Sequence, residues 1–201
     1  SRTSRCNRLR RAKFMILVVI ALEEELPGPL PSGYKKLITG VGKVNASVAL
    51  TAELCYNDQY TKIINYGSAG GSKAIKGELV GVSAVIERDM DCTPLGLPLY
   101  VSPGDEEQMI VCQTKHDSLF VCGTGDSFSV PHINYQICEM EAYALAKVAT
   151  KFKIPFDCYK YISDSDDDGE DQGEQWKQNV SKGANKFRDT ILLPQEQLEL
   201  W

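Results

Sequence analysis

The chain has 201 residues and a formal net charge of −5, and a chain of this length buries roughly 70% of its unfolded surface, which is enough for one domain with its own core. Six of the 22 basic residues lie in residues 1–14, which hold no acid, so residues 15–201 carry 16 basic and 27 acidic residues and sum to −11. That charge disfavours nucleic acid as a partner. The seven cysteines form no C-x-x-C pair and are odd in number, which argues against a disulfide framework or zinc site and favours a reducing, cytoplasmic setting.

The basic residues 1–14 precede an apolar run at residues 14–22. A signal peptide would continue into small residues at a cleavage site, whereas this run meets the triplet Glu23–Glu25, and it is too short to span a membrane. We therefore expect residues 1–14 to be an extension that is disordered or foreign to the natural protein. Residues 15–201 are expected to form one domain that opens with a buried strand.

Short apolar runs rich in β-branched residues alternate with helical patterns along the rest of the chain. Strands are predicted at residues 14–22, 62–68, 79–87, 109–114, 118–124 and 156–163, and helices at 43–56, 141–152 and roughly 173–192. Because the strands lack a clean alternation of apolar and polar residues, the sheet is expected to be covered on both faces. The predicted fold class is α/β, with layers packed as a sandwich.

In such folds the functional groups gather where strands reach their carboxyl edge. This rule selects the triplet Glu23–Glu25, "GSAGG" at residues 67–71, "GTGDSF" at residues 123–128 and the acidic segment 163–171, to which we add "CEMEAYALA" at residues 138–146. At least two acids of the triplet are expected to be solvated in the first turn of a helix, while one is well placed to act as a partly desolvated base. The "GSAGG" segment offers exposed backbone N–H groups to a ligand, or is a plain turn.

Several motifs favour simpler interpretations. "TGVGK" at residues 39–43 lacks the first glycine and the Ser or Thr of a phosphate loop, so a tight turn before a helix is preferred. The acidic segment matches the first half of an EF-hand loop, but Gln175 stands where a bidentate Glu is needed, so a solvated loop is favoured over calcium and no metal is predicted. His116 and His132 have no recognisable nucleophile beside them. Phe128, on a loop at a strand end, is a candidate to stack on a flat ligand.

Six fragments, in order, carry a resemblance to a known family: "ALEEEL", "TGVGKVNASVAL", "IINYGSAGG", "GDSF", "CEMEAYALA" and "YISDSDD". Between about Ile16 and Asp164 the chain resembles the 5'-methylthioadenosine/S-adenosylhomocysteine nucleosidases of the purine nucleoside phosphorylase superfamily. The resemblance implies a cytoplasmic, homodimeric hydrolase with a three-layer α/β/α sandwich and a mixed central sheet. It would cleave the N-glycosidic bond of an adenine nucleoside to release adenine without a metal or cofactor, while the charge and the short apolar run already argue against nucleic-acid and membrane partners.

The resemblance also assigns roles to residues of this sequence. Glu25 resembles the base that activates water, and Asp164, supported by Ser163, the acid that serves N7 of the purine. The implied substrate-binding residues are Ser68 near the ribose and water, Phe128 stacked on the purine, the Ser129 backbone at the purine edge, Met140 and Glu141 at the ribose, and Glu139 shaping that end of the site. Cleavage leaves positive charge on the sugar and negative charge on the purine, so an acid at the base and carboxylates around the ribose favour the transition state.

Two departures and three alternatives remain. Lys160 stands where the family usually has an arginine near the water, so the positioning of the nucleophile is an open question. The segments after Leu26 and before Glu139 are short and border the 5' end of the substrate, so the preference for a 5'-thioalkyl group is open as well. The alternatives are a purine nucleoside phosphorylase, a catalytically inactive nucleoside-binding protein and a calcium-binding module. Tyr66 disfavours the phosphorylase because it stands where phosphorylases tend to have an arginine.

Overall fold

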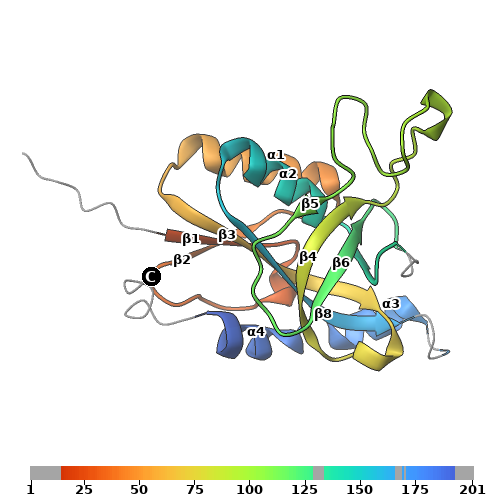
Figure 1. Ribbon diagram of the computed structural model, residues 1–201. Coiled ribbons are helices and arrows are strands. Elements are labelled where there is room, and N and C mark those ends of the chain that lie inside the picture. Colours follow the sequence, from red (N-terminus) through yellow and green to blue (C-terminus); the bar gives the residue numbers. More distant parts are fainter. Residues whose placement is uncertain (1–14, 129–133, 166–168, 170, 193–201) are drawn as a thin grey trace, which may run out of the picture.

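The computed structural model describes residues 15–128, 134–165, 169 and 171–192 (Figure 1). Its strands are β1 (Met15–Ile20), β2 (Tyr34–Ile38), β3 (Tyr60–Gly71), β4 (Leu79–Glu87), β5 (Ile110–Val111), β6 (Leu119–Thr124), β7 (Ile137–Glu139) and β8 (Phe156–Ser165). Its α-helices are α1 (Lys43–Tyr56), α2 (Ala142–Phe152), α3 (Gln172–Asn179) and α4 (Gly183–Ile191), and the short 3-10 helices are η1 (Glu23–Glu25), η2 (Lys73–Ile75) and η3 (Thr93–Leu95). The predicted extension, residues 1–14, lies outside the described residues.

The strands form one mixed sheet that closes on itself. β3 pairs in parallel with β8, β8 antiparallel with β4, β4 in parallel with β6, β6 in parallel with β7, and β7 antiparallel with β3, which completes a ring. β1 and β2 extend the sheet outward from β3 through parallel pairs, and β5 adds an antiparallel edge to β4. The predicted α/β class and mixed central sheet are confirmed, but the closure of the ring was not predicted.

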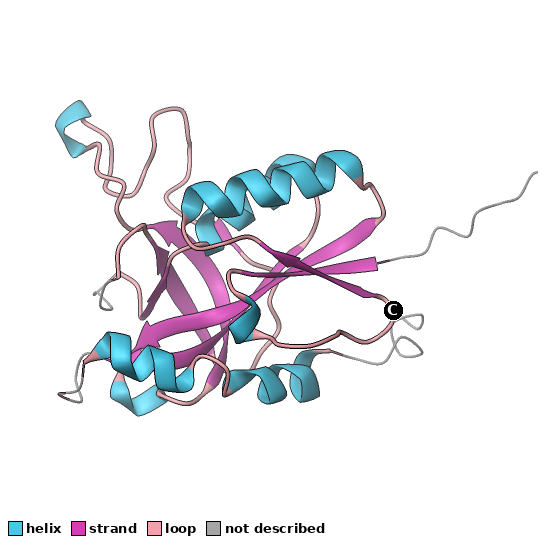
Figure 2. Ribbon diagram, turned by 180° about the vertical axis from the view of Figure 1, so that it is seen from behind, coloured by secondary structure: helices cyan, strands magenta, loops and turns pink. Residues whose placement is uncertain are grey.

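The helices cover the sheet from two sides. α1 and α2 lie together on one side, and α3 and α4 lie on the other (Figures 1 and 2). The core under α1 and α2 includes Leu50 and Leu145, both almost completely buried. The core under α4 is built around Phe187, which stacks on Tyr66 with ring centroids 4.2 Å apart. Burial of both faces of the sheet explains why its strands read as nearly continuous apolar runs.

The predicted helices and strands recur at or near their expected places, with three differences. β2 and β7 were not predicted, because β2 carries two lysines on the outer side of β1 and β7 has only three residues. "GSAGG" is neither loop nor turn, since β3 continues through Gly71. The single helix expected over residues 173–192 is two helices, α3 and α4.

Close packing at Gly183 accounts for the position of the second helix. A Cβ atom at Gly183 would lie 2.4 Å from the Tyr161 ring and 2.5 Å from the Tyr66 hydroxyl, so a side chain here would force the neighbouring groups to move. α4 therefore begins at a residue without a side chain and packs its first turn directly on β8. In the part of the chain that the structure describes, none of the helices has the length and apolar character needed to cross a membrane.

Candidate active site

A cavity of about 290 Å³ opens where several strands reach their carboxyl ends. It is lined by residues after β1, at the ends of β3, β7 and β8, after β4 and β6, and from α3: Ala21, Leu22, Glu25, Val41, Ser68, Ala69, Gly70, Arg88, Ser127, Phe128, Cys138, Glu139, Met140, Glu141, Asp164 and Trp176. Seven of the predicted site residues belong to this wall. Of the other two, Ser163 contacts Asp164 from behind, and Ser129 lies outside the described residues.

Glu25 reaches the cavity because the triplet forms a 3-10 turn, η1. The turn leaves Glu23 and Glu24 exposed and buries Glu25, whose residue surface is 4% exposed. Glu25 Oε2 accepts hydrogen bonds from the backbone N–H groups of Ala21 at 2.9 Å and Leu22 at 3.2 Å. Those two groups fix one side of the carboxylate and leave its other oxygen facing β3.

Ser68 on β3 completes the environment of Glu25. Its backbone N–H and its hydroxyl both donate to Glu25 Oε1, at 2.9 and 3.0 Å. The residue before it must be small, because a Cβ at Gly67 would lie 3.1 Å from the same oxygen. The glycine-rich part of β3 therefore lets the strand backbone approach the carboxylate directly.

Asp164 lies near the end of β8, opposite Gly70 of β3 in the strand register. The register of the two strands shifts between Ala69 and Gly70, just before this pair. Asp164 is 2% exposed, and the Ser163 hydroxyl donates to its Oδ1 at 2.6 Å. The structure thus brings the two carboxyl groups that the sequence selected, Glu25 and Asp164, to the wall of one cavity.

Glu139 is held in place rather than free to react. Its Oε2 accepts from the backbone N–H groups of Glu141 and Ala142 at the start of α2, and from Lys160 Nζ at 2.9 Å. Burial by itself raises the pKa of Glu139, but the charge of Lys160 and hydrogen bonds from Thr124 and the Glu141 backbone outweigh it, so the pKa is lowered. Burial disfavours the charge on Lys160 as well, yet Glu139 raises its pKa, and both partners are ionised.

The ion pair with Glu139 shows where Lys160, which departs from the family pattern, lies relative to the cavity. Lys160 is 1% exposed and does not belong to the cavity wall, and its ammonium group lies 3.4 Å from the position of a Cβ at Gly67. It therefore lies behind the wall, where Glu139 is its ion-pair partner.

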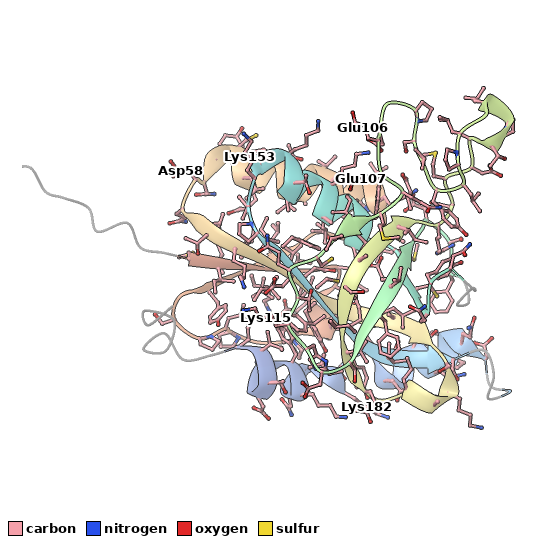
Figure 3. The ribbon with its side chains drawn as sticks, in the orientation of Figure 1. Asp58, Glu106, Glu107, Lys115, Lys153 and Lys182 are labelled. Carbon is pink, nitrogen blue, oxygen red and sulfur yellow. The ribbon has the colours of Figure 1, made fainter. Side chains whose placement is uncertain are left out.

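The charged side chains labelled in Figure 3 lie on the outside of the fold, and Lys115 and Lys182 among them are exposed.

Glu141 faces the cavity from the start of α2. Its Oε1 accepts from the backbone N–H of Gly42 at 2.8 Å, and Gly42 has a φ of 96° in the turn that precedes α1, so "TGVGK" is the predicted tight turn. Burial, followed by the negative charge of Glu139, raises the pKa of Glu141 to about 8. Met140 beside it lines the cavity and is partly buried.

Phe128 lies at the mouth of the cavity and is 55% exposed. Arg88, just beyond β4, holds the segment before it: Arg88 Nη1 donates to Ser127 Oγ and Nη2 to Gly125 O, both at 3.2 Å. A half-exposed aromatic ring on a loop anchored in this way has one face available to a flat ligand.

Sequence reasoning missed two prominent wall residues, Arg88 and Trp176. Arg88 follows β4 within a charged stretch, and Trp176 lies in the amphipathic pattern of the last predicted helix, so neither carried a local signal for a site. Among the described residues, no group of three or more His, Cys, Asp or Glu side chains could hold a metal ion. Residues 166–168 and 170 of the EF-hand-like segment lie outside that description.

Comparison with known proteins agrees with this fold and assigns the chain to the α/β enzymes of the phosphorylase superfamily. The family model described as "Phosphorylase superfamily" matches residues 36–192. The 5'-methylthioadenosine/S-adenosylhomocysteine nucleosidase of Geobacillus sp. (strain WCH70) is 31% identical over 182 residues, which cover 78% of this chain and 77% of the relative. The corresponding nucleosidase of Halalkalibacterium halodurans is 34% identical over 155 residues, or 64% of this chain and 66% of the relative.

A solved structure gives the same result for the fold. The putative 5'-methylthioadenosine/S-adenosylhomocysteine nucleosidase of Borrelia burgdorferi B31, bound to adenine, matches with a TM-score of 0.75 and 23% identity, over 93% of this chain and 100% of that one. The chain belongs to the 5'-methylthioadenosine/S-adenosylhomocysteine nucleosidase family, as its sequence fragments predicted.

Proposed function

We propose that this protein hydrolyses the N-glycosidic bond of 5'-methylthioadenosine, S-adenosylhomocysteine or a closely related adenine nucleoside, and releases adenine. The observation that carries the proposal is the presence of two buried carboxyl groups, Glu25 and Asp164, in the wall of one nucleoside-sized cavity. The names of the relatives support the same reaction.

In the proposed mechanism Glu25 removes a proton from the attacking water, and protonated Asp164 donates to N7 of the departing purine. The Ser163 hydroxyl, 2.6 Å from Asp164 Oδ1, fixes the orientation of that acid. A base on one side of the bond and an acid at the leaving group follow the logic of inverting glycoside hydrolysis. Each contributes where charge develops, so each lowers the barrier selectively.

We assign the remaining predicted site residues, including Ser129 outside the described residues, the roles that the family resemblance implies. Phe128 stacks on the purine, and the Ser129 backbone addresses its edge. Glu141 bonds the ribose hydroxyls, and Met140 packs on the sugar. Glu139 acts indirectly: it accepts from a backbone N–H at the start of α2, and its negative charge raises the pKa of Glu141. Where Glu141 is ionised, its negative charge stabilises the cation that forms on the ribose.

Water is favoured over phosphate as the nucleophile. Tyr66, which stands where phosphorylases tend to have an arginine, is 1% exposed and packs against Phe187 on the α4 side of the sheet. Among the described wall residues the only cation is Arg88, and its guanidinium already binds the 125–127 segment. Phosphate, a mono- or dianion near neutral pH, would meet the Glu25 carboxylate in this cavity, which repels it.

The decisive experiment measures adenine release from 5'-methylthioadenosine in phosphate-free buffer by chromatography. We expect turnover by the wild-type protein and a loss of at least about 100-fold in Glu25→Gln, the size of a general-base contribution. Glu24→Gln is the matched control, because Glu24 is the exposed neighbour in the same turn. Release that requires added phosphate would assign the protein to the phosphorylases, and binding without release would make it an inactive nucleoside-binding protein.

We also propose that the protein is a cytoplasmic homodimer with its sheet between two helical layers, as in its family. Two exposed valines, Val44 at 72% and Val48 at 65%, lie one turn apart on α1 and offer an apolar face to a second copy. The cysteines within the described residues form no disulfide bonds. Light scattering after size-exclusion chromatography should give a dimer mass that falls to the monomer mass in Val44→Lys/Val48→Lys, and a monomeric wild-type protein would contradict the homodimer.

A further inference from the structure

Helix α3 is attached to the end of β8 by two amide side chains. Gln175, 2% exposed, donates Nε2–H to the Ser165 carbonyl at 3.0 Å and accepts from the Ser165 N–H at 3.1 Å. Asn179, one turn later, donates to the Ser163 carbonyl at 2.9 Å. Trp176 lies between these anchors, so the backbone position from which its indole enters the cavity wall is fixed from both sides.

The indole N–H of Trp176 donates to Ser68 Oγ at 2.9 Å. An indole nitrogen can only donate, so the Ser68 oxygen must accept this bond. The single hydroxyl proton of Ser68 is then available to donate elsewhere, and Glu25 Oε1 is 3.0 Å away. The chain of donors runs in one direction, from Trp176 through Ser68 to Glu25.

The Ser68 hydroxyl is distinctive among the groups that bond Glu25. Ala21, Leu22 and Ser68 each donate a backbone N–H, and the fold fixes the direction of all three. The hydroxyl is the fourth donor, and it can rotate about the Cα–Cβ bond of Ser68. Trp176 restricts that freedom, because the observed rotamer accepts from the indole while it donates to Glu25.

We propose that Trp176 is a positioning residue for the hydrolysis: its indole N–H orients the Ser68 hydroxyl so that this hydroxyl holds the Glu25 carboxylate in its reactive direction. The inference rests on the proposed function and extends it to a helix that lies about 150 residues beyond Glu25 in the sequence. Because Trp176 acts through Ser68, replacing Trp176 should have no further effect on the rate in a protein that already lacks the Ser68 hydroxyl.

The first test is a double-mutant cycle on adenine release. We expect Trp176→Phe, which keeps an aromatic ring but removes the N–H, to lower kcat about five- to tenfold, the size of one lost hydrogen bond, with KM nearly unchanged. Ser68→Ala should lower kcat by a similar or larger factor. The double variant Trp176→Phe/Ser68→Ala should be no slower than Ser68→Ala, because residues in one hydrogen-bond chain are not additive. Gln178→Ala, an exposed change on the same helix, should have wild-type kcat.

The inference would be overturned if the double variant lost kcat by the product of the two single-variant factors. It would also be overturned if Trp176→Phe changed only KM. Either outcome would mean that the Trp176 ring only packs in the cavity wall. A second measurement does not depend on turnover. The chain has two tryptophans, Trp176 and Trp201, so two indole N–H resonances are expected in a ¹H–¹⁵N spectrum. Ser68→Ala should shift the Trp176 resonance and speed its exchange with solvent, while an unchanged resonance would contradict the contact. A wild-type protein that releases no adenine yet shows this shift would refute the proposed function while the contact itself stands.

Discussion

At the residue scale, side chains of the same type differ in exposure and in bonding partners according to their surroundings. Glu23 and Glu24 are exposed, and Glu23 binds Lys36 at 2.7 Å on the surface. Glu25, next in sequence, is buried among four donors, because the 3-10 turn rotates it toward β3. Lys160 and Glu139 differ from Glu25, because each of these two buried charges is neutralised by the other.

Removing one member of that buried pair should be costly. We expect Lys160→Met to lower the free energy of unfolding by about 3 to 5 kcal/mol, because it leaves the Glu139 carboxylate buried without its cation. Lys115→Met, at an exposed lysine labelled in Figure 3, should change it by less than about 0.5 kcal/mol. Urea denaturation followed by circular dichroism measures both, and adding Glu139→Gln to Lys160→Met should recover part of the loss. Equal stabilities for the two lysine variants would contradict the burial of this charge.

Glu141 should give the stability of the protein a specific pH dependence. Its pKa is about 8 in the folded protein, where burial and the charge of Glu139 raise it, against an ordinary value of 4.5. The folded state therefore binds a proton that the unfolded state has released between these two pH values. The stability that Glu141 contributes is complete below pH 4.5 and is lost as pH rises through about 8, with a slope of at most about 1.4 kcal/mol per pH unit.

The difference between wild type and Glu141→Gln isolates this contribution. Urea unfolding from pH 5 to 9 should show wild-type stability falling relative to Glu141→Gln as pH rises. Glu107→Gln, at an exposed glutamate labelled in Figure 3, should run parallel to wild type. A wild-type curve parallel to that of Glu141→Gln would mean that Glu141 titrates as it does in water.

At the element scale, two elements have bounds set by contacts with other elements. β3 extends through its glycine-rich end because β8 pairs with it as far as Gly71. The final helical pattern divides because Gly183 must lie directly against Tyr161 on β8. Neither contact follows from the residues in the element itself, and so local patterns gave the type of each element more accurately than its ends.

The packing at Gly183 gives a prediction at this scale. Gly183→Ala should lower the free energy of unfolding by about 1 to 3 kcal/mol, because the added methyl group forces α4 away from β8. Gly173→Ala is the matched control, since it also lies in the first turn of a helix, and its Cβ would meet only the Asp171 carboxylate at 3.3 Å. That change should be neutral or slightly stabilising, as alanine favours helix. Similar thermal melting of both variants would refute the proposed packing.

At the scale of the whole molecule, ring closure of the sheet brings distant segments to one cavity. The wall combines residues from Ala21 to Trp176, and they come mainly from the carboxyl ends of strands. A ligand in this cavity contacts segments from both ends of the described chain, so its binding should stabilise the fold as a unit rather than one loop.

Adenine should therefore raise the melting temperature of the whole protein. At a concentration 100 times its Kd we expect about 2.7 kcal/mol of added stability, which corresponds to a shift of roughly 5 to 10 °C for a domain of this size. Differential scanning calorimetry measures the shift. Phe128→Ala, which removes the proposed stacking surface, should reduce it at the same adenine concentration. A melting temperature that does not respond to adenine would mean that the folded protein does not bind it, which contradicts the proposed adenine site.

The sequence by itself determined the α/β class, most of the elements, the family and the segments that line the cavity. It could do so because apolar periodicity, turn residues and the order of short fragments are local properties of the chain. Only the tertiary structure decided which donors surround Glu25, that Lys160 neutralises Glu139, and that Trp176 reaches Ser68 across more than a hundred residues. Burial and hydrogen bonding depend on neighbours that are distant in sequence, and those neighbours meet only when the strands close the ring.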